Sequence, residues 1–349
     1  MSDFFTSLAD CGAQRVLVVN DEASGLRALI ALDDFTLGPA CGGIRTLPYA
    51  TMSAALGDVA KLSAAMTLKC AIAGLAAGGG KAVVIEHPSM DRAAAFRRLG
   101  DFIEDLGGLY RTAGDLGTSH QDLLWVAERT AYVNTSGVRL GEAAGEGIVH
   151  CILACARDRG LVDLRGLRIG VQGCGLIGAG VARSMAKHGA RVIVADVDDE
   201  RARNLAAEIG GDWLPSDDIL SADADIISPC AIGGVLTPAS VADIRAWGVC
   251  GGANNQLSDP SVDELLARRG IAYVPDFLAS SGAVIDGIAR TVMNIDPAPL
   301  LAGLEEMARS ILQTASVEGR GTDAVGREIA YRRIATARRE ARSLRSVSG

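Results

Sequence analysis

The sequence predicts an α/β protein of two domains, of which the second contains a doubly wound parallel sheet. From about residue 167 onward, short apolar runs alternate with helical segments, as they do in parallel sheets covered by helices. The motif G-x-G-x-x-G follows the first of these runs and precedes a helical segment. With 349 residues, the chain is long enough for two domains that each bury a core.

The first half of the chain predicts a smaller α/β domain. Apolar runs bounded by turn-forming residues predict its strands, and apolar residues at helical spacing predict its helices. A glycine-rich loop, TLGPACGGIR, separates the first two strands from the first helix. The expected elements are strands at 14–19, 26–32 and 82–88 and helices at 51–68 and 90–106.

A loop and a hinge are expected before the second domain. The loop RTAGDLGTSHQD carries Asp115, and Asp122 is placed to cap a helix that ends near Ala131. The glycine-rich passage GEAAGEG at 141–147 has little propensity for regular structure. We therefore expect a hinge there, followed by a helix to about Arg159.

The second half predicts repeated βα units. Residues 167–198 predict a strand, a tight turn, a helix and a second strand, and three later apolar runs each end in small or polar residues. These runs lie at 224–231, 246–255 and 271–278. The last seventy residues are expected to be helical, and their arginine-rich end predicts a solvated helix face because its apolar positions keep helical order.

Composition and charge exclude several classes of protein. A net charge of −8 leaves no dominant basic face for phosphates, so no nucleic-acid partner is expected. No uncharged run approaches twenty residues, and no basic region precedes an apolar core at the N-terminus, so neither a membrane segment nor an export signal is expected. Eight singly scattered cysteines and four histidines without ligand spacing predict reduced thiols in a cytoplasmic protein and no metal site.

Two lysines mark a candidate site in the first domain. Lys69 and Lys81 lie twelve residues apart in a segment otherwise almost without charge, and Gly78-Gly79-Gly80 precedes the second. An ammonium group is costly to bury without a partner, and an apolar setting lowers its pKa. The segment therefore predicts a pocket that holds a carboxylate and transfers protons. For this segment alone, a glycine turn between solvated lysines is the alternative.

The glycine motif predicts a dinucleotide site. Gly173, Gly175 and Gly178 form G-x-G-x-x-G between a predicted strand and helix, and Asp196 ends the next strand. The glycines permit a tight turn and a close approach of the pyrophosphate to the helix N-terminus. A carboxylate at Asp196 suits ribose hydroxyls and repels a 2′-phosphate, so NAD is favoured over NADP. The alternative is a glycine-rich turn without a nucleotide.

The chain resembles the glutamate/leucine/phenylalanine/valine dehydrogenases, a family of NAD(P)-dependent amino-acid dehydrogenases, and within it the leucine/phenylalanine/tryptophan branch. The segments that carry the resemblance follow the family's order and cover nearly the whole chain: TLGPACGGIR, AAMTLK, AGGGK, AGDLGT, VQGCGLIG, SPCAIGG, GGANNQL and YVPDFLASSGAVID. The resemblance implies a substrate-binding and oligomerisation domain at 1–140, with helices at 300–349 packing back, and a Rossmann NAD-binding domain at 141–299. It also implies a homo-oligomer, at least a dimer.

The same resemblance implies roles for single residues. Lys69 matches the lysine that holds the substrate α-carboxylate, Lys81 the catalytic lysine that assists attack of water on the imine, and Asp115 the aspartate that exchanges a proton with the amino group. Further substrate contacts are implied for Gly42, Gly43 and Asn254. The implied cofactor-binding residues are Gly173, Gly175, Leu176, Ile177, Gly178, Asp196, Cys230, Ala231 and Asn254.

The implied reaction is the reversible, NAD-dependent oxidative deamination of an L-amino acid to its 2-oxo acid and ammonia, with closure of the domains excluding water. Cys41 stands where glutamate-specific members carry a lysine, and Gly287 stands where they carry a serine, so glutamate is not expected. Together with Ala113 and Val284, these residues predict a wide apolar pocket. The expected substrate has a large apolar or aromatic side chain.

Departures from the family pattern leave alternatives open. Ser280-Ser281-Gly282-Ala283 replaces the usual Asn-Ala-Gly-Gly, and Asp286 replaces a neutral polar residue. These groups allow a polar or cationic substrate, although Asp286 can equally face away from the site. A dehydrogenase or reductase of the same fold that acts on a non-standard amino acid or imine is a further alternative. The last is a non-catalytic NAD-binding protein, which has no need of Lys69, Lys81 and Asp115 together.

Overall fold

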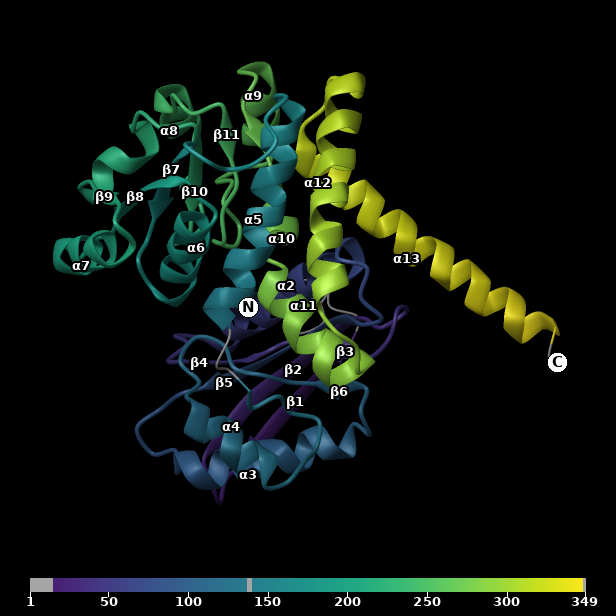
Figure 1. Cartoon of the computed structure of the whole chain (residues 1–349). Coiled ribbons are helices and arrows are strands. Elements are labelled where there is room, and N and C mark those ends of the chain that lie inside the picture. The colour runs from purple at the N-terminus through teal and green to yellow at the C-terminus, as the bar shows by residue number, and fades with distance from the viewer. Residues whose placement is uncertain (1–14, 137–139, 348–349) are drawn as a thin grey trace. The chain divides into compact units, whose positions relative to one another are not determined.

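A computed structural model describes residues 15–136 and 140–347, which form two compact units (Figure 1). Within the described residues, the first unit contains 15–136, 287–294 and 331–347, and the second contains 140–286 and 295–330. The expected two-domain α/β architecture is confirmed. The functional limits at 1–140, 141–299 and 300–349 stay a prediction.

The first unit is built on a six-stranded mixed sheet. Its strands are β1 (Arg15–Asp21), β2 (Leu26–Asp34), β3 (Ala40–Cys41), β4 (Ile44–Leu47), β5 (Gly78–Ile85) and β6 (Tyr110–Arg111). The strand order is β1-β2-β5-β3-β6, and β4 also pairs with β5. β5 runs antiparallel to β2 and parallel to β3 and β4, so three strands pair with it. It begins at the triple glycine, four residues earlier than expected.

Side-chain alternation along β5 divides the core of the first unit into two halves. Three helices cover the sheet: α2 (Met52–Ile72), α3 (Arg92–Asp105) and α4 (His120–Ala127). Ala82 and Val84 belong to the core shared with α3 and α4, whereas Val83 belongs to the core shared with α2. Because strand side chains alternate between faces, Lys81 lies on the α2 side of the sheet.

Both ends of α2 are held by specific hydrogen bonds. The Thr51 hydroxyl accepts from the Ala54 N–H at the start of the helix, as an N-cap residue does. At the other end, Arg333 donates to the carbonyl oxygens of Cys70, Ala71 and Leu75 at 2.7–3.4 Å. Arg333 belongs to α13 (Thr322–Val347), so one arginine of the C-terminal helix has a defined structural use.

Asp122 has a different role from the one expected. Ser119 is the N-cap residue of α4, and Asp122 is the third residue of the helix, whose carboxylate bonds back to the Ser119 N–H at 2.7 Å. Asp122 is fully buried and also accepts from Arg92 Nε and Nη2 at 2.8 and 2.7 Å. The prediction of Asp122 as the cap was therefore wrong: the cap is Ser119, three residues earlier, whose hydroxyl accepts from the Asp122 N–H at 3.2 Å.

The second unit contains the expected doubly wound parallel sheet. Its strands are β7 (Arg168–Gln172), β8 (Arg191–Ala195), β9 (Asp212–Trp213), β10 (Ile226–Pro229), β11 (Gly248–Val249) and β12 (Ala272–Tyr273). The order β12-β11-β10-β7-β8-β9 places the first strand in the middle, with the chain winding outward in both directions. This is the strand order of dinucleotide-binding folds, in which ligands bind at the carboxyl ends of the two central strands.

The remaining helical segments belong mostly to the second unit. They are α5 (Leu140–Asp158), α6 (Leu176–Lys187), α7 (Asp199–Ile209), the 3₁₀ segment η1 (Ser216–Ser221), α8 (Pro238–Asp243), α9 (Ser261–Arg268), α10 (Asp276–Ala279), α11 (Gly282–Ile288), the π-helical segment η2 (Ala289–Met293) and α12 (Ala298–Glu318). Of these, η2 and the end of α11 belong to the first unit. α6 and α7 pack on β7 to β9, and α12 packs along α5 (Figure 1). The expected helical C-terminal region is confirmed.

The hinge expected at 141–147 is wrong, because these residues form the first turns of α5. Their glycines permit close helix packing rather than flexibility. A Cβ atom on Gly145 would lie 2.6 Å from the carbonyl oxygen of Gly180 in α6, which is closer than side-chain carbons approach. Tertiary packing therefore overrides the low helix propensity of glycine.

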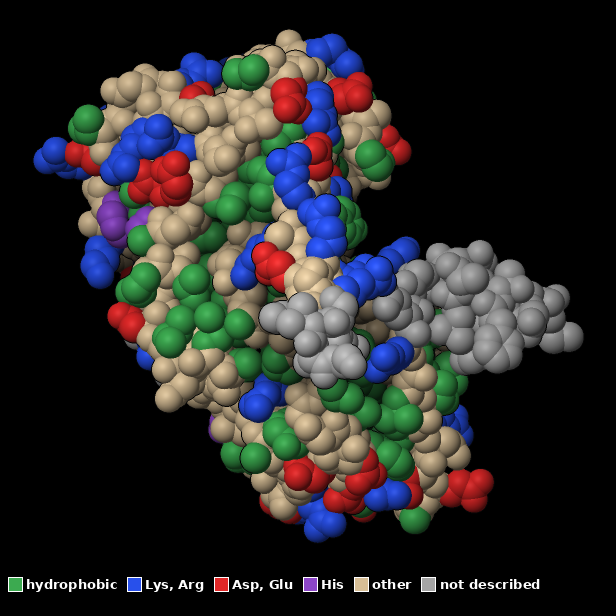
Figure 2. Space-filling model, turned by 90° about the vertical axis from the view of Figure 1, so that its right-hand side faces the viewer, with side chains coloured by type: hydrophobic (Ala, Val, Ile, Leu, Met, Phe, Trp, Pro, Cys, Tyr) green, Lys and Arg blue, Asp and Glu red, His purple; other side chains and the backbone are tan. Residues whose placement is uncertain are grey.

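The surface carries charges of both signs, and the described cysteines are free thiols. On the face shown in Figure 2, basic side chains are interspersed with acidic and apolar ones. Seven cysteines in the described part of the chain form no disulfide. No helix among the described residues is long and apolar enough to span a membrane.

We predict that Asp122→Asn destabilises the first unit by about 2 kcal/mol at pH 7, since a buried charged hydrogen bond contributes about 1.5–3 kcal/mol. Burial raises the pKa of Asp122, but its bonds to Arg92 and Ser119 outweigh this and hold the pKa below its ordinary 3.8. The stabilisation is therefore present above pH 4 and disappears as the pH falls through the lowered pKa. Urea unfolding at pH 7 and pH 3 measures it. Glu128→Gln, in an exposed ion pair with Arg97, is the control; equal losses at both pH values would contradict the prediction.

Candidate active site

Lys81 lies in β5 with its side chain almost fully shielded from water. It is 6% exposed and follows three glycines that also belong to the strand. A Cβ atom on Gly79 would lie 2.2 Å from the hydroxyl oxygen of Thr67 in α2. Only glycine at this position allows α2 to pack so closely on the strand that carries Lys81.

Lys69 occupies the last turn of α2 and is equally shielded, with 8% of its surface exposed. The turn that carries it is fixed by the bonds from Arg333 to the helix end. The low-dielectric setting expected for the two lysines is therefore present, and the alternative of solvated lysines is not supported. The role of Lys69 as a carboxylate anchor stays a prediction.

Lys81 and Asp115 are brought together across 34 positions of sequence. The Lys81 Nζ lies 2.7 Å from Asp115 Oδ2. Asp115 follows β6 in a loop that runs against β4: Ile44 donates its N–H to the carbonyl oxygen of Ala113 at 2.9 Å. The structure thus pairs the two residues for which the sequence predicted proton transfer.

The environment shifts the pKa values of both partners. Burial lowers the pKa of Lys81 below its ordinary 10.5, although the Asp115 carboxylate acts in the opposite direction. Burial alone would raise the pKa of Asp115, but the Lys81 ammonium and Arg45 outweigh it and hold it below 3.8. The carboxylate therefore stays ionised while the lysine releases its proton more easily than a surface lysine does.

The loop with Gly42 and Gly43 lies beside this pair. β3 pairs Cys41 with Gly79 of β5 on one side and with Arg111 of β6 on the other. The Gly42 carbonyl accepts hydrogen bonds from the hydroxyls of Tyr110 and Thr112 at 2.7 and 3.1 Å. Cys41, Gly42, Gly43, Ala113, Asp115 and Lys81 are therefore neighbours in adjoining strands and loops.

Sequence reasoning missed three polar residues next to this group. Arg45 donates its Nε–H to Asp115 at 3.0 Å and approaches both oxygens of Asp58 at 3.3 Å. Tyr49 donates its hydroxyl to Asp58 at 2.5 Å. Arg45 stands in the loop motif that the sequence analysis had singled out for its glycines, and that position was the available signal.

The glycine motif lies at the carboxyl end of β7, where the fold predicts a dinucleotide. Gly173 has a φ of +94°, and Gly175 is the N-cap residue of α6. No side chain among the described residues caps this helix, so its first N–H groups are available for a pyrophosphate. Leu176 and Ile177 begin the helix, and Gly178 permits the tight turn because a Cβ there would lie 1.8 Å from the Gly173 carbonyl oxygen.

Asp196 follows β8 and is tied to the glycine loop. Its carboxylate accepts from the N–H groups of Cys174 at 2.6 Å and of Asp198 at 3.0 Å. It is only 7% exposed. The residue expected to bind the ribose therefore also fixes the loop expected to bind the pyrophosphate.

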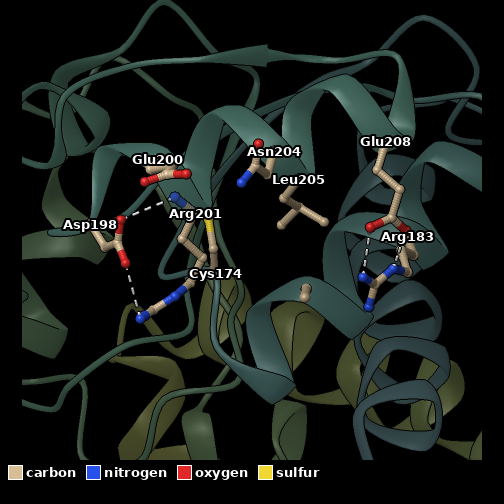
Figure 3. Close-up of a pocket in the computed structure, with 9 residues that line it drawn as sticks. Cys174, Arg183, Asp198, Glu200, Arg201, Asn204, Leu205 and Glu208 are labelled. Atoms are coloured by element: carbon tan, nitrogen blue, oxygen red, sulfur yellow. Dashed lines mark hydrogen bonds and ion pairs between the residues drawn. The ribbon is translucent and has the colours of Figure 1, made fainter.

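A cavity of about 350 Å³ opens between α6 and α7, and its lining includes Asp198 and Arg201 (Figure 3). Arg201 reaches from α7 to Asp196 at 3.3 Å and to Asp198 at 3.2 Å. Cys174, Asn204 and Leu205 are among the other lining residues. Sequence reasoning missed Arg201, whose position five residues after Asp196 was its signal.

The remaining predicted cofactor residues lie at the carboxyl ends of β10 and β11. Ala231 is in close contact with Gly173, and the Gly252 N–H points to the Cys230 sulfur at 3.4 Å. Asn254 follows in the same loop as Asn255, whose N–H donates to the buried Asp276 at 2.7 Å. The glycine motif, Asp196 and the loops after β10 and β11 therefore gather at one edge of the sheet, which fits a dinucleotide.

The residues predicted to line the side-chain pocket belong to different units. Cys41, Ala113 and Gly287 belong to the first, where the nearest atom to an added Cβ on Gly287 is Asn134 Nδ2 at 3.4 Å; Val284 belongs to the second. The unusual serines use their hydroxyls within the backbone: Ser280 donates to the Asp276 carbonyl and Ser281 to the Leu278 carbonyl. They therefore give no support to a polar substrate. No metal-binding cluster exists among the described residues.

A dinucleotide fold in one unit and a buried lysine–carboxylate pair in the other define an NAD-dependent oxidoreductase. The model of the Glu/Leu/Phe/Val dehydrogenase dimerisation domain matches residues 13–132, and that of the Glutamate/Leucine/Phenylalanine/Valine dehydrogenase domain matches residues 195–297. Residues 168–217 also match an NAD binding domain of 3-hydroxyacyl-CoA dehydrogenase.

Individual relatives agree over most of the chain. Phenylalanine dehydrogenase of Lysinibacillus sphaericus is 35% identical over 89% of this chain and 84% of its own. Leucine dehydrogenase of Geobacillus stearothermophilus is 36% identical over 78% of this chain and 77% of its own. The crystal structure of L-tryptophan dehydrogenase from Nostoc punctiforme superposes with a TM-score of 0.84 at 30% identity, covering 96% of this chain and all of that one. The chain belongs to the Glu/Leu/Phe/Val dehydrogenase family.

We predict that Asp196→Ala weakens NADH binding about tenfold, since a hydrogen bond to a charged group contributes about 1.5–3 kcal/mol. The ratio of NADPH to NADH affinity should rise because the repelling carboxylate is gone and Arg201 keeps only Asp198 as an acidic partner. Titration of dinucleotide fluorescence measures both dissociation constants. Asp199→Asn is the matched control, because it removes an exposed charge from the start of α7, the helix that carries Arg201. An unchanged NADH affinity in Asp196→Ala would remove Asp196 from the site.

Proposed function

We propose that this chain catalyses the reversible, NAD-dependent oxidative deamination of an L-amino acid with a large apolar or aromatic side chain. The products are the 2-oxo acid and ammonia. The observation that carries the proposal is the buried pair of Lys81 and Asp115, whose atoms lie 2.7 Å apart. Similarity to phenylalanine, leucine and tryptophan dehydrogenases over 78–96% of this chain supports it.

The two shielded lysines have different proposed roles, Lys69 at the substrate α-carboxylate and Lys81 at the carbon that is oxidised. Lys69, in the proposal, binds the substrate α-carboxylate as a fixed cation, which orients Cα and its amino group. When bound, NAD would supply the acceptor for the hydride from Cα, and the substrate would then be an iminium. The amide dipoles of the α6 N-terminus and the carboxylate of Asp196 are the groups proposed to hold the dinucleotide.

Lys81 and Asp115 carry out the proton transfers in the proposed reaction. Neutral Lys81 takes a proton from water as the water oxygen bonds to the iminium carbon, which gives a carbinolamine. Asp115, having taken up a proton from the substrate amine, returns it to the nitrogen so that the C–N bond breaks and ammonia leaves. Asp115, ionised again, takes the hydroxyl proton as the C–N bond breaks, which yields the 2-oxo acid. The lowered pKa of Lys81 increases the neutral fraction that this step requires.

The residues proposed to contact the substrate side chain are uncharged, which supports an apolar side chain. Burial raises the pKa of the Cys41 thiol to about 12, so the thiol is neutral at physiological pH. Ala113, Gly287 and Val284, the other proposed lining residues, carry no polar side chain. A site built from such residues gains little from a charged side chain and loses the hydration of that charge.

A hydrogen-bonding substituent on the side chain is a second candidate, favoured by Arg111. This arginine pairs with Cys41 in the sheet and stacks 5.1 Å from the Tyr132 ring. Its Nε–H is buried and has no hydrogen-bond partner in the described part of the chain. An aromatic side chain with a hydroxyl group would supply an acceptor for this donor.

We predict that a panel of L-amino acids with NAD gives the highest kcat/KM for phenylalanine, leucine, tryptophan or tyrosine. Glutamate should fall below the best substrate by at least about a hundredfold, since the lysine that pairs with its side chain in relatives is replaced by Cys41. NADH formation at 340 nm is the measurement. Preference for tyrosine that disappears in Arg111→Leu would support the second candidate. Absence of turnover with every member, despite NAD binding, would contradict the proposed function.

We predict that Lys81→Ala lowers kcat by at least about 10³-fold while the affinity for NADH stays within about twofold, since general base catalysis contributes about 10²–10⁴-fold. Lys61→Ala is the matched control, because Lys61 is an exposed lysine on α2. Stopped-flow turnover and NADH fluorescence are the measurements. Activity retained in Lys81→Ala would exclude its assigned role.

We further propose a homo-oligomer of at least two subunits in the cytoplasm. The match of residues 13–132 to a dimerisation domain supports the assembly, and the free thiols support a reducing compartment. Sedimentation at micromolar concentration should give at least twice the 36.1 kDa of one chain. A monomer under these conditions would contradict the assembly.

A further inference from the structure

The lysine–carboxylate pair of the first unit continues into a longer row of charged groups. Asp115 accepts from Lys81 at 2.7 Å and from Arg45 at 3.0 Å through the same oxygen, Oδ2. Arg45 extends to Asp58 at 3.3 Å, and Tyr49 donates its hydroxyl to Asp58 at 2.5 Å. We call these five residues the charge row; four of them alternate in sign, and Tyr49 ends the row with a neutral hydroxyl.

The members of the charge row come from separate elements of the first unit. Lys81 lies in β5, Arg45 in β4 and Asp58 in α2, while Asp115 and Tyr49 lie in connecting loops. The four charged side chains are between 7% and 28% exposed. Water and salt therefore screen these interactions less than they screen surface ion pairs.

Arginine is the residue type that this place in the charge row requires. Its planar guanidinium presents donors to Asp115 and to Asp58 at once, through Nε and Nη1. A lysine would carry the charge but offers a single nitrogen, so it cannot bridge two carboxylates in this geometry. Tyr49 in turn fixes the Asp58 carboxylate that Arg45 binds.

We propose that Arg45, anchored by Asp58 and Tyr49, is a positioning residue that fixes Asp115 against Lys81 and balances the charge around the lysine. It touches no reacting atom in this scheme and acts through Asp115. The consequence for turnover rests on the proposed function, whereas the consequence for the titration of Lys81 does not.

The charge row predicts that Arg45 and Asp58 have opposite effects on the pKa of Lys81. Burial lowers the pKa of Lys81, Asp115 raises it, Arg45 lowers it and Asp58 raises it. Removing the Arg45 charge should therefore move the pKa of Lys81 upward, and removing the Asp58 charge should move it downward. Tyr110 and Tyr49 also face the carboxylates, but burial raises their pKa values above the ordinary 10, so both stay neutral while Lys81 titrates.

The test compares Arg45→Met, Arg45→Lys and Asp58→Asn with the wild type, using kcat/KM for the best amino acid between pH 6 and 11. The wild-type rate should rise with pH along a limb centred below 10.5, because neutral Lys81 is the active form. In Arg45→Met the limb should move to higher pH and kcat should fall about 100-fold, since misplacement by about 1 Å costs about that much. In Asp58→Asn the limb should move to lower pH.

Arg45→Lys separates the effect of charge from that of position, and Arg97→Met is the control. Arg45→Lys should keep the limb near its wild-type position while kcat stays about tenfold low, because the charge is present and the bridge is absent. Arg97→Met, in the exposed pair with Glu128 on the same unit, should change neither quantity. Thermal melting identifies any variant that fails to fold, and the folded variants then test the positioning role of Arg45.

A direct titration makes the proposal independent of turnover. The Cε resonance of Lys81 in ¹³C-lysine-labelled protein, assigned by its loss in Lys81→Arg, should titrate higher in Arg45→Met and lower in Asp58→Asn. Opposite shifts without turnover of any amino acid by the wild type would support the positioning proposal and contradict the proposed function. Turnover with no shift in either variant, or with shifts in the same direction, would overturn the positioning proposal.

Discussion

The ion pair between Lys81 and Asp115 is the constraint on which the first unit depends. An ammonium group in a central strand has lost most of its hydration, so a carboxylate must be supplied at contact distance. The 2.7 Å contact meets that need. It requires the loop after β6 to lie against β4, and it requires glycine at 79 so that α2 can cover the strand. Much of the local architecture follows from placing one cation there.

Neutralising Lys81 creates a second requirement, because Asp115 is itself largely buried. Its second cationic partner, Arg45, is bonded to Asp58, and Asp58 is bonded to Tyr49. Each charged group thus pairs with one neighbour of opposite charge and with a second partner, and the row ends where the Tyr49 hydroxyl donates to Asp58. The interactions that stabilise these side chains also set the protonation states that proton transfer needs.

The second unit solves a different problem with backbone geometry. The loops after β7, β8, β10 and β11 meet at one edge of the sheet because parallel strands end there together. Asp196 joins two of these loops through its bond to the Cys174 N–H. The α6 N-terminus is left without a side-chain cap, which is the arrangement that favours an anionic ligand. The groups proposed to bind the dinucleotide therefore include one that also fixes the loop structure.

Local patterns in the sequence predicted the class of fold, the two lysines and the glycine motif of the candidate sites, whereas the role of Asp115 came from the family resemblance. The glycine motif, the alternation of strands and helices, and two lysines in an apolar segment are contiguous signals, so they were readable directly. The predicted strands and helices lie near their observed places, whereas the short strands β3, β4, β6 and β9 were not anticipated, and β3 and the start of β4 lie in the segment expected to be a loop.

Only the tertiary structure decided what depends on distant contacts. Residues 141–147 became helix because α6 packs against their glycines, and Asp122 became a buried partner of Arg92 rather than a cap. Arg45 joined the site through an aspartate 70 residues away. No local periodicity encodes such a pairing, because hydrogen bonds between remote side chains form only once the sheet and its helices have set their positions.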